Sequence, residues 1–271
     1  MKNYLYFITC ICIVTIFFSS CDDNVTEDFE TESIVVESYL FAENPLDSFK
    51  VTQAISYAAT SDDIVTIDDL TITLDDESES YLLQSIGEGY YQNLDLLIES
   101  GKTYSMEFEK NGTVISSETY VPEKNEISIS LSQISIEKID AGVMMPPTQT
   151  DPISVSWENN EGEYYYVIVE NIETDPEYIN ENFAIATFER PRIITEPQIV
   201  SDYNVDTRRD IQFFGTYRVV VYRVNPEYAA LYSTAEATSS SIVEPASNIE
   251  NGLGIMTGIS SDTIYFEVNE L

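Results

Sequence analysis

The chain has 271 residues, and a hydrophobic fraction of 43% with 12% aromatic residues indicates a folded protein rather than a disordered one. Its 48 acidic and 12 basic residues give a formal net charge of -36, which disfavours nucleic acid and anionic lipid headgroups as partners. There is no histidine and all three cysteines lie within the first 21 residues, which excludes cysteine nucleophiles, Ser-His-Asp triads, Cys/His zinc sites, haem and iron–sulfur clusters from the remainder.

Residues 1–20 have the pattern of a bacterial lipoprotein signal peptide. Lys2 supplies a positive start, residues 4–18 are a predominantly apolar run, and two small serines precede Cys21. The alternative, a transmembrane anchor, would need about 20 apolar residues and a basic flank, but an acidic Asp22-Asp23 follows. We therefore expect the leader to be removed, Cys21 to be lipidated, and residues 21–32 to form an acidic tether.

Residues 33–122 are predicted to form a first β-sandwich, immunoglobulin-like or transthyretin-like. Ile34–Phe41 and Asp47–Ile55 are rich in β-branched and aromatic residues and flank a turn at Asn44-Pro45, so they predict a hairpin. Asn111-Gly112 is a strong hairpin signal between two further strands. Strands separated by turns at this spacing are typical of antiparallel sandwiches, and the strands after the first hairpin are expected at 70–74, 81–84, 103–108 and 113–120.

Residues 123–271 are predicted to form a second sandwich, similar to a fibronectin type III domain. Its strands are expected at 126–138, 153–157, 164–170, 215–224 and 263–268. Residues 172–211 are interpreted as a long insertion, and Pro226–Ala237 as a short helix capped by Asn225. Trp157 is expected in the core, with ligand stacking as the alternative.

The densest acidic segment is the strongest candidate for a cation site. Clustered carboxylates suit Ca²⁺, but the spacing lacks the order and the glycine of an EF-hand, so a solvated rim of turns is the favoured interpretation. A carboxylate pair could also support glycoside hydrolysis, although no motif singles one out among 48 acids. The calcium candidates are Asp62, Asp63, Asp68, Asp69, Asp75 and Asp76.

Basic residues are segregated along the chain. Every lysine lies at or before Lys138, and every arginine lies at or after Arg190. Arginine is enriched at interface hot spots, so the group in or at the end of the insertion is a candidate docking surface for a partner protein or an anionic ligand. The alternative is charge balancing against neighbouring carboxylates. The group consists of Arg190, Arg192, Arg208 and Arg209.

Three features together resemble the DUF4249 family of Bacteroidetes lipoproteins: the leader, the opening strand IVVESYLF, and a closing Asn-Ile-x-x-Gly-x-Gly motif at Asn248, Ile249, Gly252 and Gly254. The acidic residues after Cys21 also resemble the surface-export signals of these lipoproteins. The resemblance implies a role beside a TonB-dependent outer-membrane receptor and carries over no catalytic residue. Gly252-Leu253-Gly254 is expected to be a turn with positive φ, not a phosphate loop.

The sequence therefore predicts an all-β outer-membrane lipoprotein, exposed at the cell surface or facing the periplasm. We expect a non-catalytic accessory or binding component of a TonB-dependent uptake system, attached to the membrane by its lipid. The alternative is an independent adhesin or glycan-binding module, and a carboxylate-based hydrolase is third. No cofactor is expected apart from the calcium candidate.

Overall fold

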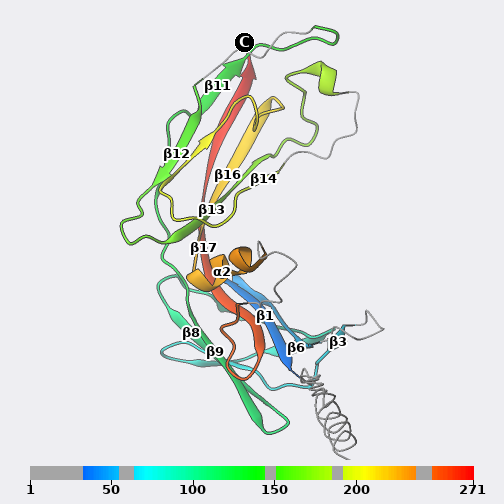
Figure 1. Ribbon diagram of the computed structural model, residues 1–271, viewed down its shortest axis with the longest axis vertical. Helices are drawn as coiled ribbons and strands as arrows, with labels where there is room; N and C mark the ends of the chain where they lie inside the picture. Colours follow the sequence, from blue (N-terminus) through cyan, green and yellow to red (C-terminus); the bar gives the residue numbers. More distant parts are fainter. Residues whose placement is uncertain (1–32, 55–63, 144–150, 185–191, 236–245) are drawn as a thin grey trace, which may run out of the picture.

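The structure, a computed structural model, describes residues 33–54, 64–143, 151–184, 192–235 and 246–271. Within these ranges the regular secondary structure is almost entirely β-strand, arranged in two sandwiches that follow one another along the long axis of the molecule (Figure 1). The expectation of an all-β fold is confirmed. The leader, Cys21 and the tether lie outside the described residues.

The first domain packs two sheets against each other. One contains β1 (Ile34–Phe41), β2 (Pro45–Gln53), β7 (Tyr90–Leu97) and β6 (Gln84–Gly87), with β3 (Val65–Thr66) beside β2. The facing sheet contains β5 (Ser80–Leu82), β4 (Thr73–Asp75), β8 (Thr103–Lys110) and β9 (Thr113–Tyr120). Alternate residues of each strand point inward, so Val36 and Phe49 of one sheet share a core with Leu74, Tyr104 and Met106 of the other.

The two predicted hairpins of this domain are confirmed. β1 pairs antiparallel with β2, and β8 pairs antiparallel with β9. Asn111 and Gly112 both have positive φ, 53° and 80°, as a two-residue turn matched to the strand twist requires.

The second domain also consists of two facing sheets. One contains β14 (Ile193–Ile194), β13 (Tyr164–Asn171), β16 (Gly215–Val224), β17 (Leu253–Glu270) and β11 (Gln133–Ile136). The other contains β10 (Ile127–Ile129), β12 (Ile153–Trp157) and β15 (Asp202–Val205). Their core includes Val155 and Trp157 from the smaller sheet and Val167, Val219 and Phe266 from the larger one.

In each domain, a tyrosine hydroxyl forms a hydrogen bond with the main chain a few residues before the strand that carries the tyrosine. The hydroxyl of Tyr104 accepts a hydrogen bond from the Glu99 amide at 2.9 Å, and that of Tyr217 accepts from the Phe213 amide at 3.1 Å. Such tyrosine corners are typical of immunoglobulin-type sandwiches. They fix the chain where it enters β8 and β16.

One strand, β17, belongs to both domains. Its first half pairs in parallel with β1, from Leu253 opposite Val35 to Ile259 opposite Phe41. Its second half pairs antiparallel with β16, ending with Val268 opposite Gly215. In Figure 1 it is the orange-to-red strand that runs past the joint, and it makes the larger sheets of the two domains continuous.

This arrangement differs from the expected division at residue 123. Ile249 and Met256 are buried in the core of the first domain, so part of the C-terminal segment completes the N-terminal sandwich. The expected last strand, 263–268, covers only the second half of β17. The segment 126–138 forms two short strands in different sheets, β10 and β11, instead of one strand.

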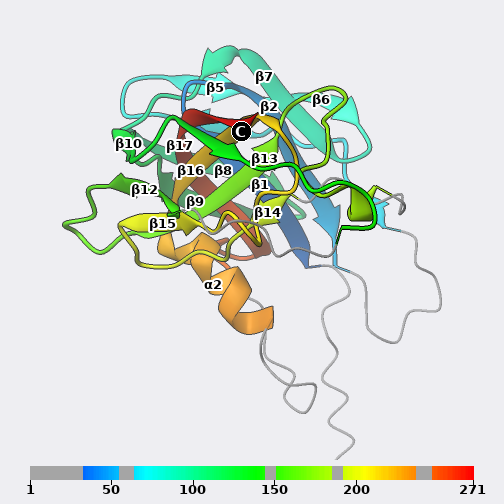
Figure 2. The same cartoon turned by 90° about the horizontal axis from the view of Figure 1, so that it is seen from above.

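The insertion and the helix also differ in detail from the expectation. Within 172–211, β15 pairs with β12 and so forms part of the second sandwich instead of an added loop. The helix α2 (Pro226–Ala235) lies outside the stacked sandwiches in the end-on view of Figure 2. Asn225 precedes it, but its side-chain amide donates to Thr119 and to the Tyr120 carbonyl of the first domain, so its side chain ties the helix to β9.

Candidate binding site

The linker between the domains, residues 121–126, is fastened to the second domain by hydrogen bonds. Arg223 of β16, whose side chain is only 14% exposed, forms an ion pair with Glu163. Its Nη1 also donates to the Glu123 carbonyl at 3.3 Å and to Asn125 Oδ1 at 3.2 Å. Ser260 Oγ of β17 donates to the same Glu123 carbonyl at 3.1 Å. The linker is therefore a fixed part of the joint.

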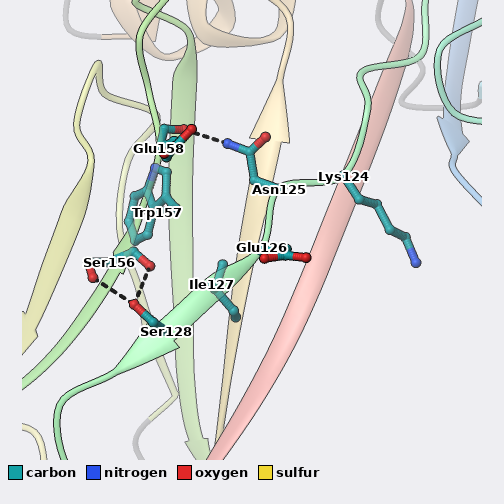
Figure 3. Close-up of a pocket in the computed structure, with 8 residues that line it drawn as sticks. All are labelled: Lys124, Asn125, Glu126, Ile127, Ser128, Ser156, Trp157 and Glu158. Atoms are coloured by element: carbon teal, nitrogen blue, oxygen red, sulfur yellow. Dashed lines mark hydrogen bonds between the residues drawn. The ribbon is translucent and has the colours of Figure 1, made fainter.

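A polar groove, here called the linker groove, lies where this linker enters β10 and passes the end of β12 (Figure 3). Its volume is about 640 Å³. A smaller depression of about 170 Å³ shares Asn125 and Glu158 with it and extends to Glu161 and Arg223. The linker groove is lined by Lys124, Asn125, Glu126, Ile127, Ser128, Ser156, Trp157 and Glu158.

Hydrogen bonds hold the walls of the groove together. Asn125 Nδ2 donates to the Glu158 carbonyl at 2.6 Å, which joins the linker to the end of β12. The hydroxyl oxygens of Ser128 and Ser156 lie 3.0 Å apart on neighbouring strands. These contacts make the groove a preformed feature rather than a gap between independent domains.

The charge in the groove is negative. Lys124 points away from Trp157 in Figure 3 and forms an ion pair with Glu43 of the first domain at 2.5 Å. Among the described residues, no lysine or arginine forms an ion pair with Glu126 or Glu158. Two carboxylates and two hydroxyls therefore suit a polar ligand that donates hydrogen bonds.

Trp157 takes the predicted core position. It is 6% exposed, its indole Nε1 donates to the Val200 carbonyl at 3.1 Å, and its ring packs 5.2 Å from that of Tyr165. The ring therefore has no open face on which a ligand could stack. Trp157 still lines the groove, but with little exposed surface.

The predicted arginine surface is not one cluster of free charges in the described part of the chain. Arg192 forms an ion pair with Glu170 at 3.5 Å, and Arg209 forms one with the buried Asp210 at 2.6 Å. Within the described residues only Arg208 of the group has no carboxylate within ion-pair distance. Arg190 lies outside those residues.

The acidic segment does not assemble a metal site from the residues that the structure describes. Asp68 accepts a hydrogen bond from the Gly89 amide at 2.6 Å, and Asp69 forms an ion pair with Lys110 at 2.8 Å. Asp75 lies in β4. Asp62 and Asp63 lie outside the described residues.

Asp76 has a structural role in the turn after β4. Its Oδ1 accepts hydrogen bonds from the amides of Ser78 and Glu79, both at 2.8 Å, and its Oδ2 pairs with Lys102 at 3.0 Å. The hydrogen bond from the Ser78 amide, followed by the contact with Lys102, holds the pKa of Asp76 well below its usual value.

The closing motif fastens β17 to the first domain. The Asn248 side chain pairs with the main chain of Met256, accepting from its amide at 3.0 Å and donating to its carbonyl at 2.7 Å. Gly254 has φ of +102°, as expected, but lies in β17 instead of a turn, and Gly252 does not have a positive φ. A Cβ on Gly254 would lie 2.0 Å from the Val36 carbonyl oxygen, so glycine lets β17 approach β1.

Sequence reasoning did not find the linker groove. Its residues come from the linker and from the end of β12, about 30 positions apart, and meet only because β10 pairs with β12. The one local signal is the polar run Glu123 to Glu126 after Pro122, which identifies a linker but not what it packs against.

The fold and the groove define a two-domain β-sandwich protein with an open, polar groove at the joint. The chain belongs to the DUF4249 family, described as a domain of unknown function, and the match covers residues 20–264. The family predicted from the opening strand and the closing motif is thereby confirmed.

Other comparisons add little. No curated protein matches the chain. The crystal structure of domains A168-A170 from titin is similar at 10% identity, covering 72% of this chain and 60% of that chain, with a TM-score of 0.21. No helix in the described ranges is long and apolar enough to span a membrane.

Proposed function

We propose that the protein is an outer-membrane lipoprotein, anchored through Cys21, that acts as a non-catalytic accessory or binding component beside a TonB-dependent uptake receptor. The leader and Cys21 support the anchor, and the family resemblance supports the receptor. The linker groove is the surface that would hold a polar ligand for that receptor.

The observation that carries this proposal is the strand shared at the joint. β1 and β17 run in parallel toward the joint, where β17 continues into the second domain (Figure 1). The eight residues of β1 span roughly 25 Å, so the joint and its groove lie about that far from Ile34, the first residue of β1. Such a body suits presentation of a site to a neighbouring membrane protein.

The test is purification of the native, lipidated protein from detergent-solubilised outer membranes, followed by identification of co-purifying proteins. We expect a TonB-dependent receptor in stoichiometric amount. Glu126→Lys together with Glu158→Lys should reduce its recovery. Glu107→Lys together with Glu109→Lys, both exposed on β8, is the matched charge control. Recovery without any receptor would overturn the accessory role.

The polar lining of the groove favours glycan binding as a second candidate function. Carboxylates and hydroxyls at close spacing are common partners of sugar hydroxyls. A glycan array probed with the mature chain, with and without EDTA, tests this function. Binding that survives EDTA but is lost in Ser128→Val and Glu158→Gln, together with recovery of the native protein without a receptor, would favour an independent glycan-binding role, whereas an array without signal would remove it.

A further inference from the structure

Six tyrosines gather on the outer face of the joint, on the opposite side of the larger sheet from the two cores. The rings of Tyr166 and Tyr222 stack with centroids 4.5 Å apart, and Tyr228 of α2 lies 5.8 Å from Tyr166. Burial raises the pKa of Tyr166 and Tyr228 above that of an exposed phenol, as expected for rings packed against one another. The six are Tyr39, Tyr164, Tyr166, Tyr222, Tyr228 and Tyr232.

A groove of about 330 Å³, here called the tyrosine–proline groove, lies between α2 and the edge of this sheet. On the helix side, Pro226, Ala229 and Ala230 lie at positions i, i+3 and i+4, which is one face of the helix. Because alanine side chains are small, this wall of the groove is shallow. The groove is lined by Tyr164, Glu196, Pro197, Pro226, Ala229, Ala230 and Tyr232.

The opposite wall is produced by a bulge in the edge strand. Val167 accepts from the Thr195 amide at 3.0 Å, but two residues earlier Tyr165 pairs with Gln198, not with residue 197. One extra residue is therefore inserted at Glu196-Pro197. Such bulges redirect side chains at a sheet edge. Proline is tolerated at this position because it has no amide hydrogen that would be left without a partner.

Hydrogen bonds to β9 and β17 fix the position of the helix wall. Glu227 Oε1 accepts hydrogen bonds from Thr119 and Thr257, both at 3.1 Å, which ties the first turn of α2 to β9 and β17. Asn225 adds its bonds to β9. A groove whose walls are already placed costs little ordering entropy on binding.

The lining points to one class of ligand. Proline rings of a polyproline II segment pack against aromatic side chains in a shallow groove. This helix has no internal hydrogen bonds, and its extended conformation is already formed before binding. Glu196 at the rim is exposed, and none of the described lysines or arginines forms an ion pair with it. On a chain with a net charge of -36, this carboxylate favours a basic neighbour to the prolines.

We propose that the tyrosine–proline groove binds an extended, proline-rich segment of a partner protein that carries arginine or lysine beside its prolines. This site is separate from the linker groove and does not depend on the lipid anchor or on the receptor role.

The test uses a fluorescein-labelled peptide, Pro-Pro-Arg-Pro-Pro-Arg-Pro-Pro, titrated with the full mature chain and followed by fluorescence anisotropy at physiological salt. We expect saturable binding. Tyr232→Ala should weaken it about tenfold, as for a contact residue of an interface, and Glu196→Gln by a similar factor. Tyr265→Ala is the matched control, because Tyr265 is 51% exposed but lies outside the groove.

Two further peptides separate the parts of the proposal. Glutamate in place of arginine, and serine in place of proline, should each weaken binding about tenfold or more. If the serine peptide binds as tightly as the proline peptide, charge alone attracts the ligand and the proposal is wrong. The proposal is also wrong if no saturable binding is seen. It is wrong as well if Tyr232→Ala binds as tightly as the wild type while the far-ultraviolet circular dichroism spectra of the two are the same.

Discussion

Replacing Gly254 by alanine tests how tightly β17 is held against β1. At φ of +102° a residue with a Cβ is strained by about 1–2 kcal/mol. The new Cβ would also lie 2.0 Å from the Val36 carbonyl oxygen, a main-chain atom that cannot rotate away. Overpacking of this kind costs about 1–3 kcal/mol. Because alanine also restricts the unfolded chain by about 0.5 kcal/mol, we expect the free energy of unfolding to fall by about 2–4 kcal/mol.

Two other glycines separate these contributions. Gly87 has φ of +92° and no atom within 4 Å of the position that a Cβ would take, so Gly87→Ala should show the backbone strain alone. Gly258 does not have a positive φ, but its Cβ would lie 2.2 Å from the Tyr120 carbonyl oxygen, so Gly258→Ala should show the packing cost alone. Gly254→Ala should be the most destabilised of the three.

The assay is urea unfolding of the mature chain, followed by two signals. Trp157, the single tryptophan, reports by fluorescence on the second core, whereas circular dichroism reports on both sandwiches. Because β17 is shared, a change at Gly254 in the first domain should shift both midpoints together. The reasoning is refuted if Gly254→Ala is no worse than Gly87→Ala, or if the Trp157 midpoint stays at its wild-type value.

Three further outcomes are expected. Asp76→Asn should lower stability by about 2 kcal/mol at pH 7, because it weakens hydrogen bonds to a charged group. Since the pKa of Asp76 is lowered in the folded state, its contribution is present above about pH 4 and is lost as the pH falls below that. The difference in the free energy of unfolding between Asp76→Asn and the wild type should therefore narrow from pH 5 to pH 2, and a constant difference would contradict this. Arg208→Glu, an exposed substitution, should leave the thermal midpoint of unfolding within about 1 °C of the wild-type value. If the arginine surface docks a partner, this variant should recover less receptor, and unchanged recovery would dismiss that surface. Cys21→Ser should move the protein to the soluble fraction with an unchanged circular dichroism spectrum, and a variant still in membranes would disprove the anchor.

The parts of the fold that could be predicted are those with local signals. The first hairpin and the turn at Asn111-Gly112 follow from alternation and turn chemistry within a few residues. The first half of β17 could not be found in this way. It is buried on both faces and contains Gly254 and Gly258, so it has neither alternation nor high strand propensity.

The assignment of that segment to the first domain depends on a contact that is remote in sequence. Leu253 pairs with Val35, more than 200 residues earlier, and no periodicity encodes such a partner. The linker groove shares this property, because its two segments meet through the pairing of β10 with β12. Trp157 was predictable, since a lone tryptophan that ends an alternating strand is best buried between two sheets.

The shared strand β17 couples the folding of the two domains. Without it, the first domain lacks the strand beside β1 and the second lacks the strand between β16 and β11. A sheet edge that awaits its strand exposes unpaired amide and carbonyl groups, and before β17 docks both domains have such an edge. Docking of this one strand therefore completes both sandwiches, and neither domain is expected to reach its native form before the other.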